Sequence, residues 1–402
     1  MKYVILVGDG MGDYPLPELQ NRTPLAAART PAMDALCHQG RLCRLRSIPP
    51  GYPPGSDVAN LSLMGYRPEE VYTGRAPLEA ASMGVALAAD ETAFRCNLVT
   101  VADRNDGGLT MVDYSADHIT TAEAAELIKA LDRQLGNDHL RVYPGVSYRH
   151  LLVYRGDYGS LATVPPHDYT GKEVTLPWQA YATTGLGEFM RQAREMLPDQ
   201  PVNRQRIKAG KSPANAVWLW GEGHTPAMRT HKELFNISGA LISAVDLLKG
   251  IGICAGMEII NVEGATGYLD TNYAGKVEAA LSASRRHDLV FVHVEAPDEA
   301  GHEGSLAKKL QAIEDLDAKV VAPVRAGLEA AGEPFRLVVA MDHLTPLATR
   351  THSADEVPVI LFDSHGAWPA SGLAYTEANA ASTGAPLADG QALYRLLLDQ
   401  TP

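Results

Sequence analysis

Six residues from three separate stretches of the chain have the types and spacing needed to hold divalent metal ions. They are Asp9, Asp298, His302, Asp342, His343 and His352. Carboxylate oxygens and imidazole nitrogens together form a donor set that suits zinc or manganese. Asp298 and His302 are four residues apart, so one turn of a helix can aim both side chains at a single ion. These residues predict a shared metal site.

Ser56 is the candidate nucleophile. It stands between Gly55 and Asp57, directly before the apolar segment Val58–Met64. A serine hydroxyl is a weak nucleophile at neutral pH, but a divalent cation can lower its pKa as it does for bound water. If the apolar segment is a helix, its N-terminus would favour an incoming phosphate. The sequence therefore predicts phosphoryl transfer through Ser56 on two metal ions.

Each of these residues, taken alone, also fits a structural role. Asp9 or the pair Ser56-Asp57 could cap a helix. Asp342-His343 could form a turn, and His302 or His352 could be surface histidines. The complete set favours a metal site, because three predicted strands are each followed by an aspartate and two of these aspartates have a histidine within reach.

The candidate metal ligands come after short apolar runs in the sequence. These runs predict buried parallel strands, because they are continuous and β-branched. The runs are Tyr3–Val7, Leu289–Val294, Leu337–Met341 and Val357–Phe362, with Gly252–Ile260 as a weaker candidate. Helical patterns occupy Pro31–Gly40, Gly239–Leu248, Gly275–Ser284 and Leu306–Ala331. This alternation predicts an α/β fold with a mostly parallel sheet and helices on both faces. Ligands bind such sheets at the carboxyl ends of the strands.

The middle of the chain has a different pattern. The strand-like pieces Leu109–Asp113 and His150–Tyr154 mingle there with the helical segments Thr121–Leu135 and Gly185–Met196, and prolines punctuate the region. We predict a smaller α+β domain over residues 93–225. It would be inserted into a discontinuous metal-binding domain formed by residues 1–92 and 226–402.

The composition and the charge limit the cellular locations and the partners that the protein can have. The net charge of −13 argues against a nucleic-acid binder, which needs a basic surface. No apolar stretch approaches the roughly 20 residues that span a bilayer, and the N-terminus has no signal-peptide pattern. The four cysteines form no C-x-x-C pair. We expect a cytoplasmic protein with reduced thiols, and the sequence predicts no particular oligomeric state.

The order of these residues resembles that of the alkaline phosphatase superfamily. More narrowly, it resembles the cofactor-independent phosphoglycerate mutases of archaeal type. The resemblance covers nearly the whole chain, and the segments that carry it are Gly8–Met11, Pro54–Asn60, Tyr72–Pro77, Glu295–His302 and Asp342–His352.

This resemblance implies a metal centre, a reaction and a cap domain. One metal ion would be held by Asp298, His302 and His352, and a second by Asp9, Ser56, Asp342 and His343. Manganese is the expected ion, while zinc, cobalt and magnesium also tolerate such ligands. Ser56 would become a phosphoserine while 3-phosphoglycerate and 2-phosphoglycerate interconvert without bisphosphoglycerate. The inserted domain would close over this small phosphorylated metabolite.

Further residues are candidates for contacting the substrate. Pro165–Lys172 resembles a short His-Asp motif of the family, in which His167 and Asp168 could act as acid and base on the substrate hydroxyls, with Lys172 beside them. A plain turn is the alternative interpretation of this stretch.

Three more basic residues are candidates for binding substrate anions. Arg75 and Arg95 suit the phosphate and the carboxylate because arginine binds both bidentately. Each arginine fits a structural ion pair equally well. Lys276 is a further candidate, which an exposed lysine on a helix would explain as well.

Other functions stay open at this point. The runs Val217–Gly221, Ser243–Leu248 and Gly264–Tyr273 resemble a bacterial side branch of the family, proposed to act as homoserine kinases. That likeness would make the chain a phosphotransferase acting on a small hydroxyl compound. A phosphatase or phosphodiesterase could use the same centre. A metal-binding regulator without catalysis is the interpretation from a different class.

Overall fold

The computed structural model describes residues 1–159, 161 and 163–399. The chain divides into two compact units, the first formed by Met1–Tyr72 and Ala227–Pro402 and the second by Thr73–Pro226. The first boundary lies earlier than the expected one at residue 92. Helix α5 (Ala76–Ser82) causes this difference, because its buried Ala76 and Ala80 pack against Ala93, Leu151 and Val153 of the second unit.

Unit 1 is built on a seven-stranded sheet in the order β2-β12-β11-β1-β10-β8-β9. The strands are β1 (Lys2–Gly8), β2 (Arg41–Leu45), β8 (Gly239–Ile242), β9 (Glu258–Ile259), β10 (Leu289–Val294), β11 (Phe335–Ala340) and β12 (Val357–Asp363). The five strands from β11 to β9 run parallel, so the carboxyl ends of β1, β10 and β11 meet at one edge. The predicted parallel direction of Val357–Phe362 is wrong, because β12 pairs antiparallel with both of its neighbours.

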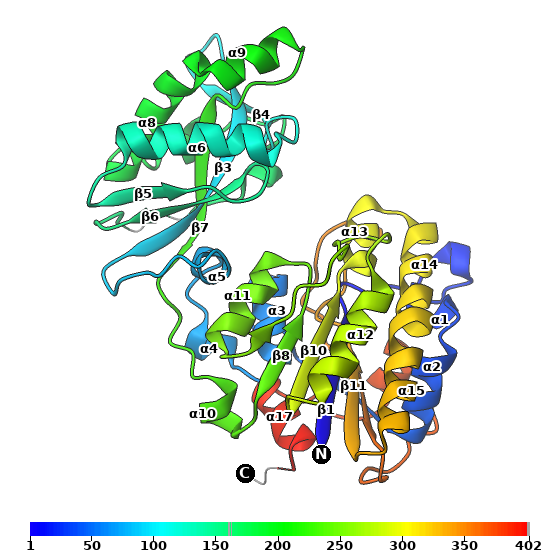
Figure 1. Ribbon diagram of the computed structural model, residues 1–402. Helices are drawn as coiled ribbons and strands as arrows, with labels where there is room; N and C mark the ends of the chain where they lie inside the picture. The colour runs from blue at the N-terminus through cyan, green and yellow to red at the C-terminus, as the bar shows by residue number, and fades with distance from the viewer. Residues whose placement is uncertain (160, 162, 400–402) are drawn as a thin grey trace. The chain divides into compact units, whose positions relative to one another are not determined.

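Helices cover the sheet of unit 1 (Figure 1). They are α1 (Pro24–Ala27), α2 (Pro31–Gln39), α3 (Ser56–Leu63), α4 (Pro68–Val71), α10 (His231–Phe235), α11 (Asp246–Cys254), α12 (Tyr273–Ser284), α13 (Ala296–Glu303), α14 (Leu306–Leu316), α15 (Ala322–Ala331), α16 (Glu377–Ala381) and α17 (Gly390–Leu397). Helices α12 and α15 pack together, while α3 packs with α11 and α17. No helix in the described part of the chain is both long and apolar enough to cross a membrane.

Three predicted elements of unit 1 differ from the structure, and the first is the weaker strand candidate Gly252–Ile260, which covers the end of α11 and the two-residue strand β9. The predicted helix Gly239–Leu248 is the fully buried strand β8 followed by the start of α11. An apolar run this short does not distinguish a strand from a buried helix by its periodicity. The long helical pattern Leu306–Ala331 contains a π-helical turn, η4 (Asp317–Val321). The Asp317 carboxylate accepts hydrogen bonds from the backbone of Ala32 and Met33, at the start of α2.

Unit 2 is an α+β structure on a five-stranded antiparallel sheet. Its strands are β3 (Thr92–Asp103), β4 (Leu109–Asp113), β5 (Leu140–Tyr143), β6 (Arg149–Tyr154) and β7 (Ala216–Gly223). Its helices besides α5 are α6 (Thr121–Leu135), α7 (Thr175–Gln179), α8 (Gly185–Met196) and α9 (Pro201–Lys208). Strand β3 pairs with β4, β6 and β7. Sequence analysis missed β3, because the buried polar residues Arg95 and Asn97 interrupt its apolar pattern.

Candidate metal centre

The parallel strands of unit 1 bring the predicted metal ligands together. Two groups of side chains have ligand atoms within 4.8 Å of one another: Asp298, His302 and His352 form the first, and Asp9, Asp298 and His343 the second. Asp9 follows β1, Asp298 lies in α13 directly after β10, and His343 follows β11. Since these strands are neighbours in the sheet, residues far apart in the sequence meet at one edge.

In the first group, two histidines face one carboxylate. His302 Nε2 lies 3.1 Å from Asp298 Oδ2, and His352 Nε2 lies 3.5 Å from Asp298 Oδ1. The two Nε2 atoms are 3.0 Å apart. The Nδ1 atom of His302 lies 3.0 Å from the Arg350 carbonyl oxygen, to which it donates. This bond leaves Nε2 of His302 as the nitrogen available to an ion.

The second group surrounds Nε2 of His343, which is fully buried. This nitrogen lies 3.4 Å from Asp9 Oδ1, 3.3 Å from Asp342 Oδ2 and 3.1 Å from Ser56 Oγ. Asp342 is thus adjacent to the group, although it belongs to neither of the two ligand sets. Its Oδ1 accepts hydrogen bonds from the backbone N–H groups of Gly10 and His343.

Ser56 is the first residue of α3 and does not cap the helix. The N-cap position belongs to Gly55, which has no side chain. Asp57 Oδ1 accepts from the Val58 backbone N–H in the first turn at 2.9 Å, and its Oδ2 accepts a hydrogen bond of 2.6 Å from the Tyr72 hydroxyl. The Ser56 hydroxyl therefore points to His343 instead of satisfying the helix backbone.

The electrostatics of the cluster favour a bound cation. Burial, with further contributions from Asp342 and Asp298, raises the pKa of Asp9 well above its ordinary value. Burial also acts to raise the pKa of Asp298, but hydrogen bonds from His302 and His352 hold it well below its usual range. Asp9 Oδ1 is buried and has no hydrogen-bond partner among the described residues. Buried carboxylates need a partner or a metal ion, so these residues fit divalent cations.

Two polar residues that sequence analysis missed hold the ligands in place. The Thr345 hydroxyl donates to Asp298 Oδ1, and His343 Nδ1 lies 3.2 Å from the same hydroxyl. Asn60 Nδ2 donates to Asp342 Oδ2 and to the Ser56 carbonyl, each at 2.9 Å. Asn60 lies one helical turn after Ser56, and this spacing was the signal that could have found it.

The predicted arginines lie in unit 2, where they share one carboxylate. Arg95 Nε is 2.9 Å from Glu79 Oε2, and Arg75 Nε is 3.0 Å from Glu79 Oε1. The buried Arg95 guanidinium also stacks over Trp220, 4.0 Å from the ring centroid. The structural ion pair weighed as an alternative therefore exists at both arginines. Glu79 was not among the predicted residues.

The His-Asp motif lies on an exposed 3₁₀ turn of unit 2, η2 (Pro166–Tyr169). His167 Nε2 is 3.8 Å from Asp168 Oδ1, and Lys172 Nζ donates to the Asp168 carbonyl at 2.8 Å. The His167 ring meets the Trp220 ring edge-on at 5.6 Å. Trp220 therefore contacts both His167 and Arg95, which are two of the predicted substrate residues of this unit.

Lys276, also predicted to contact the substrate, lies on helix α12 of unit 1. Its side chain is buried in unit 1, and Nζ donates to the His293 carbonyl at 2.7 Å. Burial lowers the pKa of Lys276 to about 8. The alternative of an exposed lysine is wrong, because α12 turns this side chain toward strand β10.

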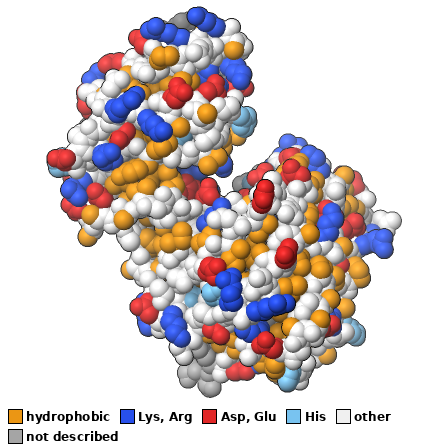
Figure 2. Space-filling view, in the orientation of Figure 1, with side chains coloured by type: hydrophobic (Ala, Val, Ile, Leu, Met, Phe, Trp, Pro, Cys, Tyr) orange, Lys and Arg blue, Asp and Glu red, His pale blue; other side chains and the backbone are white. Residues whose placement is uncertain are grey.

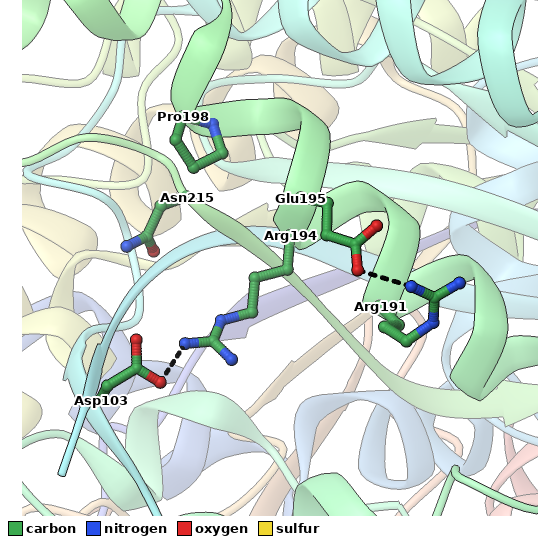
Figure 3. A pocket seen from close by; sticks show the side chains of 6 residues that line it. All are labelled: Asp103, Arg191, Arg194, Glu195, Pro198 and Asn215. Atoms are coloured by element: carbon green, nitrogen blue, oxygen red, sulfur yellow. Dashed lines mark hydrogen bonds and ion pairs between the residues drawn. The ribbon is translucent and has the colours of Figure 1, made fainter. Parts of the chain in front are cut away.

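A surface hollow in unit 2 is unrelated to these residues (Figure 3). It has a volume of about 380 Å³ and is lined by Asp103, Arg191, Arg194, Glu195, Pro198 and Asn215. Arg194 pairs with Asp103 at 2.6 Å and Arg191 with Glu195 at 2.5 Å, so its charges compensate one another. Acidic and basic side chains are interspersed in the same way over the face shown in Figure 2.

The fold and the site together define a metal-dependent enzyme of phosphoryl transfer. A family model described as 2,3-bisphosphoglycerate-independent phosphoglycerate mutase matches residues 37–203. A probable 2,3-bisphosphoglycerate-independent phosphoglycerate mutase of Geobacter sulfurreducens is 51% identical over 402 residues, covering 100% of both chains. A 2,3-bisphosphoglycerate-independent phosphoglycerate mutase of Methanosarcina acetivorans is 51% identical over 96% of each chain. The chain belongs to this family, which confirms the resemblance read from its motifs.

Solved structures confirm the predicted α/β fold class. A protein from Pyrococcus horikoshii superposes with a TM-score of 0.80 at 29% identity, over 99% of this chain and 96% of the other. A cofactor-independent phosphoglycerate mutase from Thermoplasma acidophilum gives a TM-score of 0.65 at 27% identity, over 99% of each chain.

Proposed function

We propose that the chain is an isomerase that interconverts 3-phosphoglycerate and 2-phosphoglycerate without 2,3-bisphosphoglycerate, through a phosphoserine at Ser56. The observation that carries the proposal is the Ser56 hydroxyl, which lies 3.1 Å from Nε2 of a buried histidine in the ligand cluster. Similarity over the whole length of relatives that carry this name supports the substrate assignment.

The proposed metal ligands keep the first group of side chains, while in the second Ser56 and Asp342 take the place of Asp298. Asp298, His302 and His352 would hold one ion, and Asp9, Ser56, Asp342 and His343 the other. Two such ions lower the pKa of a bound hydroxyl and balance the charge of phosphoryl oxygens. Manganese is the expected metal, and zinc, cobalt and magnesium are the alternatives.

The reaction is an exchange of one phosphoryl group. Ser56 Oγ forms a bond to phosphorus as the bond to the 3-oxygen breaks, and that oxygen takes up the proton that Ser56 loses. The 2-oxygen then attacks the same phosphorus as the bond from Ser56 Oγ to phosphorus breaks, and the proton of the 2-hydroxyl returns to Ser56 Oγ. The first backbone N–H groups of α3 favour the phosphoryl oxygens at the helix N-terminus.

Residues of unit 2 are proposed to act on the rest of the substrate. His167 and Asp168 would move protons at the two hydroxyl groups. Arg75, Arg95 and Lys172 would bind the carboxylate and the phosphate. We place the reaction in glycolysis and expect a cytoplasmic enzyme with a small phosphorylated metabolite as its partner.

The decisive experiment couples the protein to enolase, with 3-phosphoglycerate and Mn²⁺ present and bisphosphoglycerate absent. We expect turnover by the native protein, and a loss of about 10³-fold or more in Ser56→Ala, because the covalent step is removed. Stripping the metal with a chelator is the control. No turnover by the native protein with Mn²⁺ present would refute the proposal.

The same preparation separates the other functions considered. Release of free phosphate that is much faster than isomerisation would indicate a phosphatase. Phosphohomoserine, formed from homoserine and ATP and detected by mass spectrometry, would indicate the kinase-like branch. Full activity of Ser56→Ala in every assay would remove the covalent step from the mechanism.

A further inference from the structure

His293 is a polar residue inside an otherwise apolar strand. It is the fifth residue of β10, whose sequence is Leu-Val-Phe-Val-His-Val, and its side chain is completely buried. A buried imidazole in such a strand needs hydrogen-bond partners to offset the loss of water. Sequence analysis did not single out this residue, although a lone histidine in a buried apolar run was a signal that could have found it.

Hydrogen bonds assign both ring nitrogens of His293. Nε2 lies 2.8 Å from Asp9 Oδ2, and Nδ1 lies 3.4 Å from Ser243 Oγ. Ser243 Oγ accepts a hydrogen bond of 3.0 Å from the backbone N–H of Val245, so its own proton is free to be donated to Nδ1. The ring proton is then on Nε2, which donates to Asp9.

This chain of hydrogen bonds separates the two oxygens of Asp9. Oδ2 is occupied by His293, whereas Oδ1 has no hydrogen-bond partner among the described residues and lies 3.4 Å from His343 Nε2. We propose that His293, oriented by Ser243, is a positioning residue that fixes the Asp9 carboxylate so that Oδ1 alone binds metal. The inference rests on the proposed metal centre and assigns a role within it that neither Ser243 nor His293 had.

Lys276 of helix α12 supports the same arrangement through the backbone of β10. Its buried Nζ donates to the carbonyl of His293 and so holds the strand at this residue. Lys276 thus acts on the backbone that carries the positioning residue.

A nucleophilic role for the Ser243–His293–Asp9 chain does not fit the structure. Only 4% of Ser243 is exposed, so substrate cannot reach its hydroxyl. Ser243 donates its proton to His293 Nδ1 over the long distance of 3.4 Å. The same imidazole ring already donates its own proton from Nε2 to Asp9. Orientation of the carboxylate is the role that this geometry allows.

The test is a titration of metal-free protein with Mn²⁺, followed by calorimetry and by electron paramagnetic resonance of the free ion. We expect the native protein to bind two ions. His293→Leu should lower the affinity for one of these ions by about 10- to 100-fold, as is typical when a partner of a metal ligand is removed, and leave the affinity for the other unchanged. His293→Gln retains an N–H donor at similar reach and should recover most of the lost affinity.

The matched control is His231→Leu, which removes another buried histidine of unit 1. His231 Nε2 contacts the Met64 carbonyl at 2.8 Å and none of the proposed ligands. This variant should lose stability while both Mn²⁺ affinities stay at the native level. If His293→Leu does not fold, Ser243→Ala replaces it, and the affinity of the same ion should fall.

The outcomes separate this inference from the proposed function. Two native-like Mn²⁺ affinities in His293→Leu, or in Ser243→Ala where it serves as the replacement, would overturn the positioning role and leave the metal centre standing. An equal loss of affinity for both Mn²⁺ ions in His293→Leu and in His293→Gln would also overturn the positioning role, since that pattern indicates general damage to the fold. Failure of the native protein to bind Mn²⁺ would overturn both proposals.

Discussion

At the scale of single residues, Asp298 is the carboxylate that both candidate ligand groups share. Thr345 connects it to the second group, because its hydroxyl donates to Asp298 Oδ1 and lies 3.2 Å from His343 Nδ1. A threonine in this position fixes which nitrogen of His343 faces the ligand cluster. The side chain therefore acts on the orientation of the ligands and requires no contact with substrate.

Replacing Thr345 by valine tests this arrangement, since valine has nearly the same shape and lacks the hydroxyl. We expect kcat to fall by about 10-fold or more, with the protein still folded, because the partners of metal ligands tune both affinity and activity. Steady-state kinetics over a range of Mn²⁺ concentrations measure the effect. Thr349→Val, at an exposed position of the same loop, is the control. Equal kinetics for the two variants would contradict this role.

At the scale of elements, a buried ion pair ties α14 to the loops that carry the ligands. Lys309 Nζ is 3.0 Å from Asp13 Oδ2 and donates to the carbonyls of Gly12 at 2.8 Å and Thr345 at 2.7 Å. Both side chains of the pair are fully buried. The helix after the metal-binding segment thus holds the loop after β1 against the loop after β11.

Lys309→Met should destabilise the protein by about 3–5 kcal/mol, because it leaves the Asp13 carboxylate buried without its cation. Urea unfolding of the metal-free protein gives the free energy of unfolding. The double variant Lys309→Met/Asp13→Leu removes both charges and should recover a large part of the loss. A single variant as stable as the native protein would show that the pair makes no net contribution.

The elements differ in how well a local pattern predicts them. Strands β1 and β10 were predicted closely, because central parallel strands are apolar on both faces. Strand β3 was not predicted, because it contains the buried polar residues Arg95 and Asn97. Arg95 pairs with Glu79 and Asn97 accepts a hydrogen bond from Trp220, and a local sequence pattern does not show such contacts. The direction of β12 was wrong for a related reason, since its apolar run is the same whichever way the strand is paired.

At the scale of the whole molecule, each unit contains a buried histidine that is neutral when folded. In unit 2, burial and then Arg149 lower the pKa of His150 to about 3. Its Nδ1 accepts a hydrogen bond of 3.0 Å from the Gly145 backbone, and its Nε2 has no partner among the described residues. In unit 1, burial lowers the pKa of His231 to about 4.

These histidines predict that acid destabilises both units. The unfolded chain binds a proton near pH 6.5 whereas the folded protein does not, so the stability is complete above that pH and falls as the pH drops toward the folded pKa. Between pH 6.5 and 5 each histidine should contribute a loss of about 2 kcal/mol. Three of the four tryptophans lie in unit 2, so urea unfolding followed by tryptophan fluorescence reports mainly on that unit.

His150→Gln is the variant that isolates this effect, because glutamine does not titrate. The difference in unfolding free energy between pH 6.5 and pH 5 should shrink by about 2 kcal/mol relative to the native protein. The same pH dependence in both proteins would contradict the assignment of the loss to His150.

The sequence by itself determined the family, the α/β class, the central strands and the residues that gather as candidate metal ligands. These features could be predicted because apolar runs mark buried strands and the ligands directly follow those runs. Only the tertiary structure decided that Lys276 is buried, that Glu79 joins Arg75 to Arg95, and that His293 turns the Asp9 carboxylate. The Arg95–Glu79, Lys276–His293 and His293–Asp9 contacts each join different elements, and the last joins residues that are 284 positions apart. Such contacts are created by the order and register of the strands, which no local pattern of residues contains.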